Sequence, residues 1–205
     1  MPAPTHVLAQ LSTIANETTW LAMLWHAALL IALSAFLRGW RPTRRTAALM
    51  LAIPIASVGI VAATYGNVFN TLVFGGLTVA LVTIALRMRD DQIGRAADWQ
   101  VLVGHSFVGF GVLYPQFLDQ HSPLAYLVAA PFGTLPCPTL AAIIGFTLLA
   151  GGFSKAWNLT LVFFAVFYGT VGVMQLGVWI DIALVLGGLT LSWTAANLMY
   201  RPRYA

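Results

Sequence analysis

The sequence predicts an all-α integral membrane protein, a single domain over residues 1–205 that forms a polytopic bundle of seven transmembrane helices. Three observations predict this fold class. Apolar residues make up 60% of the chain and charged residues only 8%, whereas about a quarter of a soluble domain is charged. Apolar runs of nearly membrane-spanning length follow one another, and every basic residue falls between or after them. Much of the protein surface therefore needs the bilayer as its solvent.

The predicted spans follow from the lengths of the apolar runs, because about 20 mostly apolar residues cross the roughly 30 Å hydrocarbon core as a helix. The runs cover about 19–37, 46–65, 71–86, 99–118, 135–153, 157–176 and 178–200. A further run at about 124–134 is too short to span, which predicts a re-entrant or interfacial segment. No Lys or Arg precedes the first run, unlike the basic start of a cleaved signal peptide, so we expect this helix to stay in the mature protein.

Basic residues give the bundle its predicted orientation. Seven spans place all ten of them in the first, third and fifth loops and the C-terminal tail, on one side of the membrane: Arg38, Arg41, Arg44, Arg45, Arg87, Arg89, Arg95, Lys155, Arg201 and Arg203. The positive-inside rule makes this side cytoplasmic, with the C-terminus there and the N-terminus outside. Fusing the second and third runs would turn the third loop outward. Without a chain reversal at Gly177, the tail would lie outside as well.

Charged residues are absent from the centres of the predicted spans, and Asp181, near the outer end of the seventh, comes closest. This argues against a proton-coupled pump, which usually needs a carboxylate relay at membrane depth. It also argues against a retinal protein, because the only lysine, Lys155, lies in a loop. The net charge of +4 comes from basic residues clustered between the apolar runs, where the positive-inside rule acts. It therefore indicates the lipid bilayer and not nucleic acid as the partner.

The most unusual local feature is Pro136-Cys137-Pro138-Thr139 at the start of the fifth run. Each proline restricts the residue before it to extended geometry, so a regular helix should begin near Pro138, whose missing N–H does no harm in a first turn. Cys137 then lies just ahead of a helix N-terminus, whose partial positive charge favours a thiolate. A thiolate there predicts binding of a soft metal ion or reaction with an oxidant. The alternative is a proline-stiffened helix start with an inert cysteine.

Other candidate ligands gather on the predicted outer side. His121 and Asp119 lie in the loop after the fourth run, Tyr114 lies near the end of that run, and Asp181 lies near the start of the seventh. Together with Cys137 they form a hypothetical binding site. Their spacing matches no metal motif, and a metal site needs three or four converging ligands. Within this set, Cys137 and His121 are the candidate metal ligands.

Two more histidines, His26 and His105, stand inside apolar runs. His26 follows a small residue, Ala22, by four positions, a spacing that would let a flat macrocycle lie against the helix. For both histidines, hydrogen bonding inside the bundle is the alternative to binding a cofactor. The chain contains no Gly-rich phosphate loop, nucleophile elbow or HExxH. The residues therefore name no cofactor.

A series of short motifs links the fourth run to the fifth: Tyr114-Pro115, His121, Pro123, Phe132-Gly133 and Pro136-Cys137-Pro138-Thr139. The series resembles a family of uncharacterised bacterial polytopic inner-membrane proteins, in which Tyr-Pro is followed by Gly-His, an aromatic-Pro, Phe-Gly and a helix-opening Pro-Cys-Pro-Thr. This chain differs by having Gln120 before the histidine and Ser122 at the aromatic position. A similar helix count and short basic loops extend the resemblance over most of the chain. It carries no activity, and implies that the outer loop and Cys137 form one unit with the fourth and fifth helices. The structural motif of this unit is Phe132, Gly133, Pro136, Pro138 and Thr139.

These features predict a non-enzymatic protein of the bacterial inner membrane with an outer-face site made of Cys137, His121 and Tyr114. The site would bind or transport a soft metal ion or another small solute. One alternative is an accessory subunit of a larger membrane complex, or a self-associating subunit, which suits the short loops and the few buried polar groups. Another is a membrane enzyme with a cysteine nucleophile, but the sequence offers no evident base and orienting group beyond His121.

Overall fold

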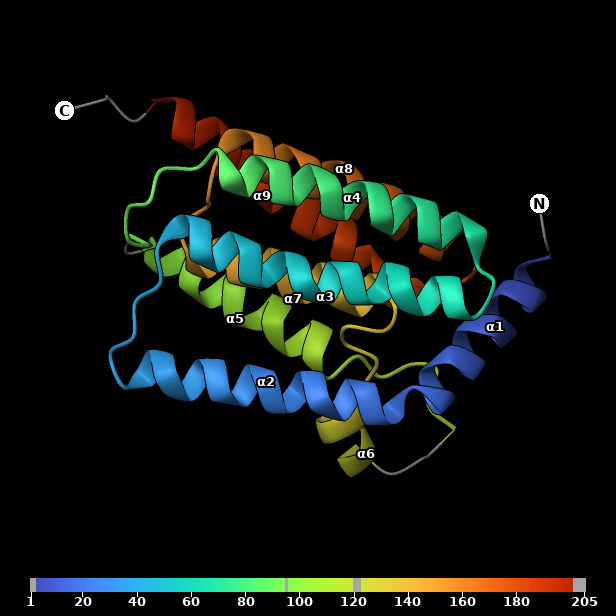
Figure 1. Cartoon of the computed structure of the whole chain (residues 1–205). Helices are drawn as coiled ribbons and strands as arrows, with labels where there is room; N and C mark the ends of the chain where they lie inside the picture. The colour runs from blue at the N-terminus through green and yellow to red at the C-terminus, as the bar shows by residue number, and fades with distance from the viewer. Residues whose placement is uncertain (1–2, 95, 120–122, 201–205) are drawn as a thin grey trace.

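The structure, a computed structural model, describes residues 3–94, 96–119 and 123–200 of the chain (Figure 1). It is all-α, as predicted, and within these ranges the one bridge between extended segments joins Thr43 and Gln92. The elements are α1 (Pro4–Glu17), α2 (Thr19–Leu37), α3 (Arg44–Thr64), α4 (Val68–Leu86), α5 (Asp98–Val112), α6 (Pro123–Ala129), α7 (Pro136–Leu149), α8 (Lys155–Met174), the short 3₁₀ helix η1 (Trp179–Asp181) and α9 (Ile182–Tyr200).

Several of these helices are long and apolar enough to cross a membrane. Within the described ranges they are α3, α4, α8 and the segment Trp179–Asn197 of η1 and α9. α1 and α2 meet at a bend of 65° and add a fifth crossing if they form one broken span. α5 has 15 residues and α7 has 14, so each extends roughly 21–23 Å against about 30 Å of hydrocarbon. Helix lengths therefore support four or five crossings out of the seven expected.

Polar caps set where three of the long helices begin. Side-chain oxygens of Thr43, Asn67 and Ser154 accept hydrogen bonds from backbone N–H groups three residues later, in the first turns of α3, α4 and α8. Such caps satisfy donors that a helix leaves free at its start. Each helix therefore begins two or three residues before the apolar run that predicted it, because capping and not hydropathy sets the boundary.

α1 is an element that the length of apolar runs does not predict. It begins at Pro4, which suits a first helical turn, and it buries Leu11, Ile14 and Ala15 along one face. This face belongs to a small core with Val61, Leu118, Ala129 and Leu135. α1 therefore covers the end of α3 and the connections on either side of α6.

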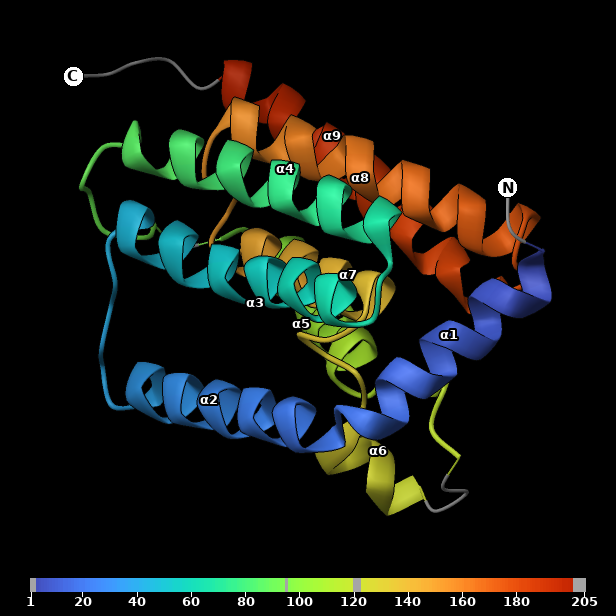
Figure 2. The same cartoon turned by 45° about the vertical axis from the view of Figure 1, so that its right-hand side comes forward.

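Three helix pairs form the body of the protein: α3 with α4, α5 with α7, and α8 with α9 (Figures 1 and 2). α7 is the central helix, because it also contacts α3, α8 and α9 and buries almost every one of its residues. The main core gathers around it, with fully buried side chains that include Phe74, Leu140, Ile144 and Leu191. The chain that carries the predicted cysteine thus runs through the interior.

Glycines let the backbones of α5 and α7 touch each other. A Cβ on Gly111 would collide with the backbone of Pro138 and Ala142 in α7. A Cβ on Gly145 would likewise collide with the backbone of Val108 in α5. Helix pairs in membranes gain their association energy from such close van der Waals packing. The two short helices therefore form one tightly packed unit.

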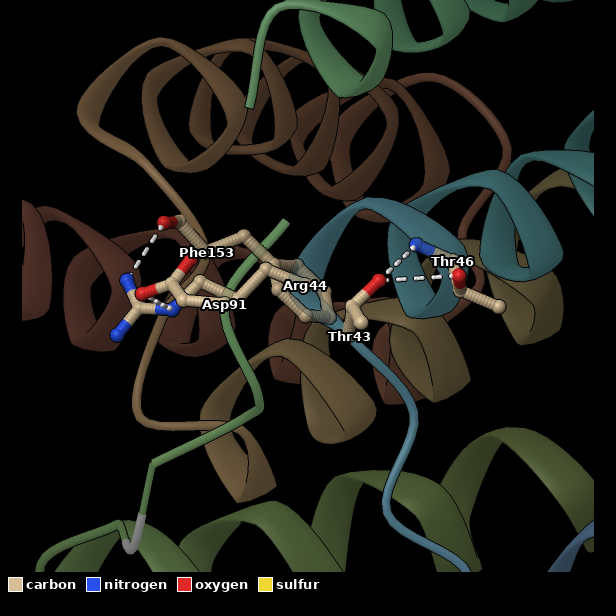
Figure 3. A network of polar contacts seen from close by, with 5 residues as sticks. All are labelled: Thr43, Arg44, Thr46, Asp91 and Phe153. Atoms are coloured by element: carbon tan, nitrogen blue, oxygen red, sulfur yellow. Dashed lines mark hydrogen bonds and ion pairs between the residues drawn. The ribbon is translucent and has the colours of Figure 1, made fainter. Parts of the chain in front are cut away.

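The connections that carry basic residues meet at one end of the bundle, called the basic end below. The Arg44 backbone N–H donates to the Asp91 carbonyl at 2.8 Å. The Arg44 guanidinium donates to the Phe153 carbonyl at 3.4 Å and pairs with the Asp91 carboxylate at 3.4 Å (Figure 3). Arg45 donates to the Met88 carbonyl at 2.9 Å. These contacts join the α2–α3, α4–α5 and α7–α8 connections.

α1 links the connections at the opposite end, called the far end below. The Gln10 amide donates to the Tyr65 carbonyl, and the Asn67 amide donates to Gln10, both at 3.1 Å. The Asn16 amide donates to the Phe117 carbonyl at 2.9 Å. α1 therefore ties the α3–α4 turn to the segment that follows α5, beside the place where the predicted ligands lie.

Candidate functional site

Tyr114, Cys137 and Asp181 meet at the far end, where α5 ends, α7 begins and the chain enters α9. The Tyr114 hydroxyl donates a hydrogen bond of 2.7 Å to Oδ1 of Asp181. Tyr114 is fully buried and Asp181 is 2% exposed, whereas Cys137 is half-buried. The Cys137 thiol lies near the same carboxyl group, close enough to interact with it electrostatically. These three residues, called the Asp181 cluster below, form a buried polar group around one carboxyl.

The end of α5 positions Tyr114. The helix stops at Val112, because Tyr114 precedes Pro115 and a residue before proline is disfavoured in helical geometry. The Tyr114 ring packs edge-on against Phe110, with centroids 5.5 Å apart, and stacks on Phe117 at 6.3 Å. Aromatic side chains therefore pack against the Tyr114 ring, and its hydroxyl is the atom that needs a polar partner. Asp181 supplies it.

A tight reversal after α8 positions Asp181. Gly177 has a φ of 71°, in the left-handed region that favours glycine, and the Val178 N–H donates to the Gly172 carbonyl at 2.8 Å. Because α8 and α9 pack together across this turn, the chain reverses at Gly177 as expected. The Asp181 side chain then lies against Gly172, where a Cβ would overlap Oδ2. Gly172 therefore leaves the space that the carboxyl group fills.

The first turn of α7 positions Cys137. The helix begins at Pro136 and not near Pro138 as expected, so Cys137 lies within the first turn and not ahead of it. The fixed φ of proline suits helical geometry, which lets both prolines enter the turn. A helix start leaves its first N–H groups without internal partners, and proline has none. Of the first three residues only Cys137 carries an N–H, which lowers the cost of burying this helix start.

The turn before α7 depends on Thr139. Its hydroxyl accepts a hydrogen bond from the Gly133 N–H at 2.9 Å and donates to the Leu135 carbonyl at 2.7 Å. Gly133 has a φ of 78°, and a Cβ there would collide with the indole ring of Trp25 in α2. Phe132 packs edge-on against the same ring at 6.2 Å. The Phe-Gly and Pro-Cys-Pro-Thr motifs thus hold one compact turn that leads into Cys137.

The remaining predicted ligands do not join the Asp181 cluster where the structure describes them. Asp119 is exposed, and its backbone N–H donates to the Asn16 side chain of α1 at 3.0 Å. The sequence did not predict α1, and the hydrogen bonds of Asn16 hold the segment after Tyr114 on that helix. His121 lies outside the described residues.

Both histidines inside apolar helices contact backbone carbonyls. His26 is 6% exposed, with Nδ1 at 2.8 Å from the Ala22 carbonyl oxygen and Nε2 at 2.9 Å from that of Val112. Neither ring nitrogen of His26 is then free to ligate a macrocycle. His105 is exposed on α5, with Nδ1 at 2.7 Å from the Val101 carbonyl oxygen. His26 instead joins α2 to the end of α5.

Two buried polar features were not among the predicted site residues. The Tyr168 hydroxyl of α8 donates to the Asn70 side chain of α4 at 2.7 Å. Asn158 of α8 is fully buried, and both polar atoms of its amide lack a hydrogen-bond partner among the described residues. The signal for both is an amide inside or beside an apolar run, which is costly in a bilayer and therefore informative.

The Asp181 cluster places a thiol and a phenol beside one carboxyl group. Across the part of the chain that the structure describes, no three His, Cys, Asp or Glu residues are grouped to hold a metal ion. The cluster therefore offers one sulfur and one carboxyl ligand, which is too few for a structural zinc site. A soft ion that binds thiolate with few ligands fits this donor set better.

Comparisons with known proteins identify no family or relative of this chain. No protein-family model, curated protein or solved structure matches it. The resemblance to uncharacterised inner-membrane proteins therefore stays a prediction that rests on the motifs between Tyr114 and Thr139.

Proposed function

We propose that the protein is a non-enzymatic integral membrane protein that binds a soft metal ion, or another small solute, at the Asp181 cluster. The observation that carries this proposal is that a single buried carboxyl group accepts a hydrogen bond from the Tyr114 hydroxyl and lies beside the half-buried Cys137 thiol. Burial of a carboxyl group is costly unless it is bonded, and an ionisable group inside a membrane protein is by default a candidate functional site. Cys137 would supply the soft ligand and Asp181 the second ligand and compensating charge.

The proposed setting is a bacterial inner membrane, with seven crossings, the N-terminus outside and the C-terminus in the cytoplasm. The basic residues in alternate connections support this orientation, as do the contacts that gather three of those connections at the basic end. α5 and α7 would cross as a pair in which α7 is enclosed by other helices, which relaxes the length that a lipid-exposed helix needs. The Asp181 cluster would then lie on the outer side.

The test measures silver-ion binding to the full-length protein, purified in mild detergent, by isothermal titration calorimetry. We expect one tightly bound ion per chain. Cys137→Ser should weaken binding at least about tenfold, because the hydroxyl is a poor ligand for soft ions. Met174→Leu is the matched control: it removes an exposed soft sulfur, since Met174 is 80% exposed, and should leave affinity unchanged.

Equal affinity of the wild-type protein and Cys137→Ser would remove the metal-binding proposal. Weakening by Met174→Leu alone would show that silver binds a surface thioether. A membrane protein that co-purifies in stoichiometric amount, together with absent silver binding, would favour the accessory-subunit alternative.

A further inference from the structure

The second half of α2 has little protein around it. α2 contacts α1 and α6, and Figures 1 and 2 both show it set apart from the three helix pairs. No side chain from residue 27 to residue 35 is buried. Leu30 is 62% exposed and Ile31 is 71% exposed. This apolar half of the helix therefore needs a covering that the described residues do not supply.

A shallow, open groove of about 330 Å³, formed between side chains of α2 alone, follows this half of the helix. It is lined by Leu30, Ile31, Ser34, Ala35 and Arg38. At about 100° per residue these positions share one face of the helix. The lining changes along the groove from aliphatic side chains to a hydroxyl and then to a guanidinium at the basic end. A ligand that is apolar over most of its length and anionic at one end would complement this lining.

Arg38 differs from the other arginines in the α2–α3 connection and the first turn of α3. Arg41 donates to the Trp40 carbonyl at 3.1 Å, and Arg44 and Arg45 are held by carbonyl groups of neighbouring connections. Arg38 is exposed and has no hydrogen-bond or ion-pair partner in the part of the chain that the structure describes. Its charge is available to an external anion.

We propose that this groove binds an anionic phospholipid, with the phosphate at Arg38 and an acyl chain along Leu30 and Ile31. A guanidinium binds phosphate through charge-assisted hydrogen bonds in a geometry that matches its planar fork. The acyl chain covers the aliphatic lining, and Ser34 donates a hydroxyl near the headgroup. The site depends on the membrane setting proposed above and is independent of metal binding at the Asp181 cluster.

A second copy of the chain fits the same face less well. Two copies in one membrane have the same orientation, so a twofold axis beside α2 would bring the two Arg38 side chains together. Like charges at that point oppose association. An anionic headgroup complements the charge.

Native mass spectrometry of the full-length protein tests the site. The protein is incubated with phosphatidylglycerol or phosphatidylcholine of identical acyl chains, and lipid retention is compared. We expect several-fold greater retention of phosphatidylglycerol by the wild-type protein and by Arg38→Lys. Arg38→Gln should abolish this preference. Arg89→Gln, which removes an exposed charge from another connection at the same end, should leave it intact. Ala35→Trp, which fills the groove, should lower retention of both lipids.

Equal retention of the two lipids by the wild-type protein would overturn the proposal, as would a preference that survives Arg38→Gln. Displacement of the lipid by millimolar inorganic phosphate would show a simple phosphate site. A dimeric mass without bound lipid, broken by Ala35→Trp, would identify a second copy as the occupant. Silver binding should be the same in all these variants, so failure of this proposal and failure of the proposed function can be told apart.

Discussion

At Tyr114 a single hydroxyl group decides whether the Asp181 carboxyl has its strongest partner. Tyr114→Phe keeps the ring packing and removes the 2.7 Å hydrogen bond. We expect the unfolding free energy to fall by about 1–3 kcal/mol, the cost of leaving a buried polar group without its partner, and the thermal midpoint to fall with it. Scanning fluorimetry in detergent measures this. Tyr126→Phe is the control, because its hydroxyl donates over 3.3 Å in a partly buried position; equal losses in the two variants would deny Tyr114 a special role.

At Asn158 we expect the opposite effect, a gain in stability when the polar group is removed. Its buried amide lacks a partner for both polar atoms among the described residues, and an unsatisfied buried amide costs about 1–3 kcal/mol. Asn158→Leu, which keeps the branching at Cγ and the number of side-chain heavy atoms, should therefore raise the thermal midpoint. Asn158→Asp, which adds a charge at the same place, should lower it. A lower midpoint in Asn158→Leu would mean that the amide is bonded in the membrane-embedded protein.

The residues of the Asp181 cluster show what could be inferred without a structure. Tyr114, Cys137 and Asp181 were grouped because each lies at the end of an apolar run on one predicted side. Tyr114 and Asp181 form a hydrogen bond, and Cys137 lies beside them. Asp119 was grouped for the same reason, but it lies with α1 instead. Sidedness limits residues to one end of a bundle, and only packing decides which of them touch. Gly172 illustrates this, because its role is the room it leaves for Oδ2 of Asp181.

Helix ends were the least predictable feature at the scale of elements. The fourth run overestimates α5, which stops before Pro115, and the fifth overestimates α7, which stops at Leu149. After α7, Gly151 and Gly152 have φ values of 72° and 84°, and their N–H groups cap carbonyls of the last turn. Both stop signals are visible in the sequence, but apolar length continues past them. Hydropathy reports burial in the bilayer and does not report where the backbone can stay helical.

The contact between α5 and α7 gives a prediction for a pair of elements. Gly145→Ala would place a Cβ against the backbone of Val108, so the helices must separate and lose packing along their length. We expect a strong fall in yield and an aggregated elution profile in size-exclusion chromatography. Gly109→Ala is the matched control, since nothing lies within 4 Å of a Cβ there. It should be neutral, or stabilising by up to about 1 kcal/mol from helix propensity. A monodisperse Gly145→Ala protein would contradict the close contact.

At the scale of the whole molecule, sidedness is the property to test. The proposed orientation puts the α3–α4 turn outside and the α4–α5 connection inside the cell. Alkaline phosphatase fused after Asn67 should therefore be active, and green fluorescent protein fused after Arg89 should be fluorescent. The two reporters exchanged between these positions should both be silent. The reverse pattern would place the basic end outside and would contradict the positive-inside assignment.

The short α5 and α7 also bear on how the chain is made. A translocon releases helical segments into lipid as they leave the ribosome. A helix that is short and exposes glycine backbone gains little free energy by entering the lipid on its own. We expect α5 to be retained until α7 has been synthesised, so that the two enter the bilayer as a preassembled hairpin. Asp181 emerges later still, after α8. The carboxyl group would then pack beside Tyr114 and Cys137 as one of the last steps of biogenesis. Formation of the cluster would therefore coincide with completion of the helix bundle.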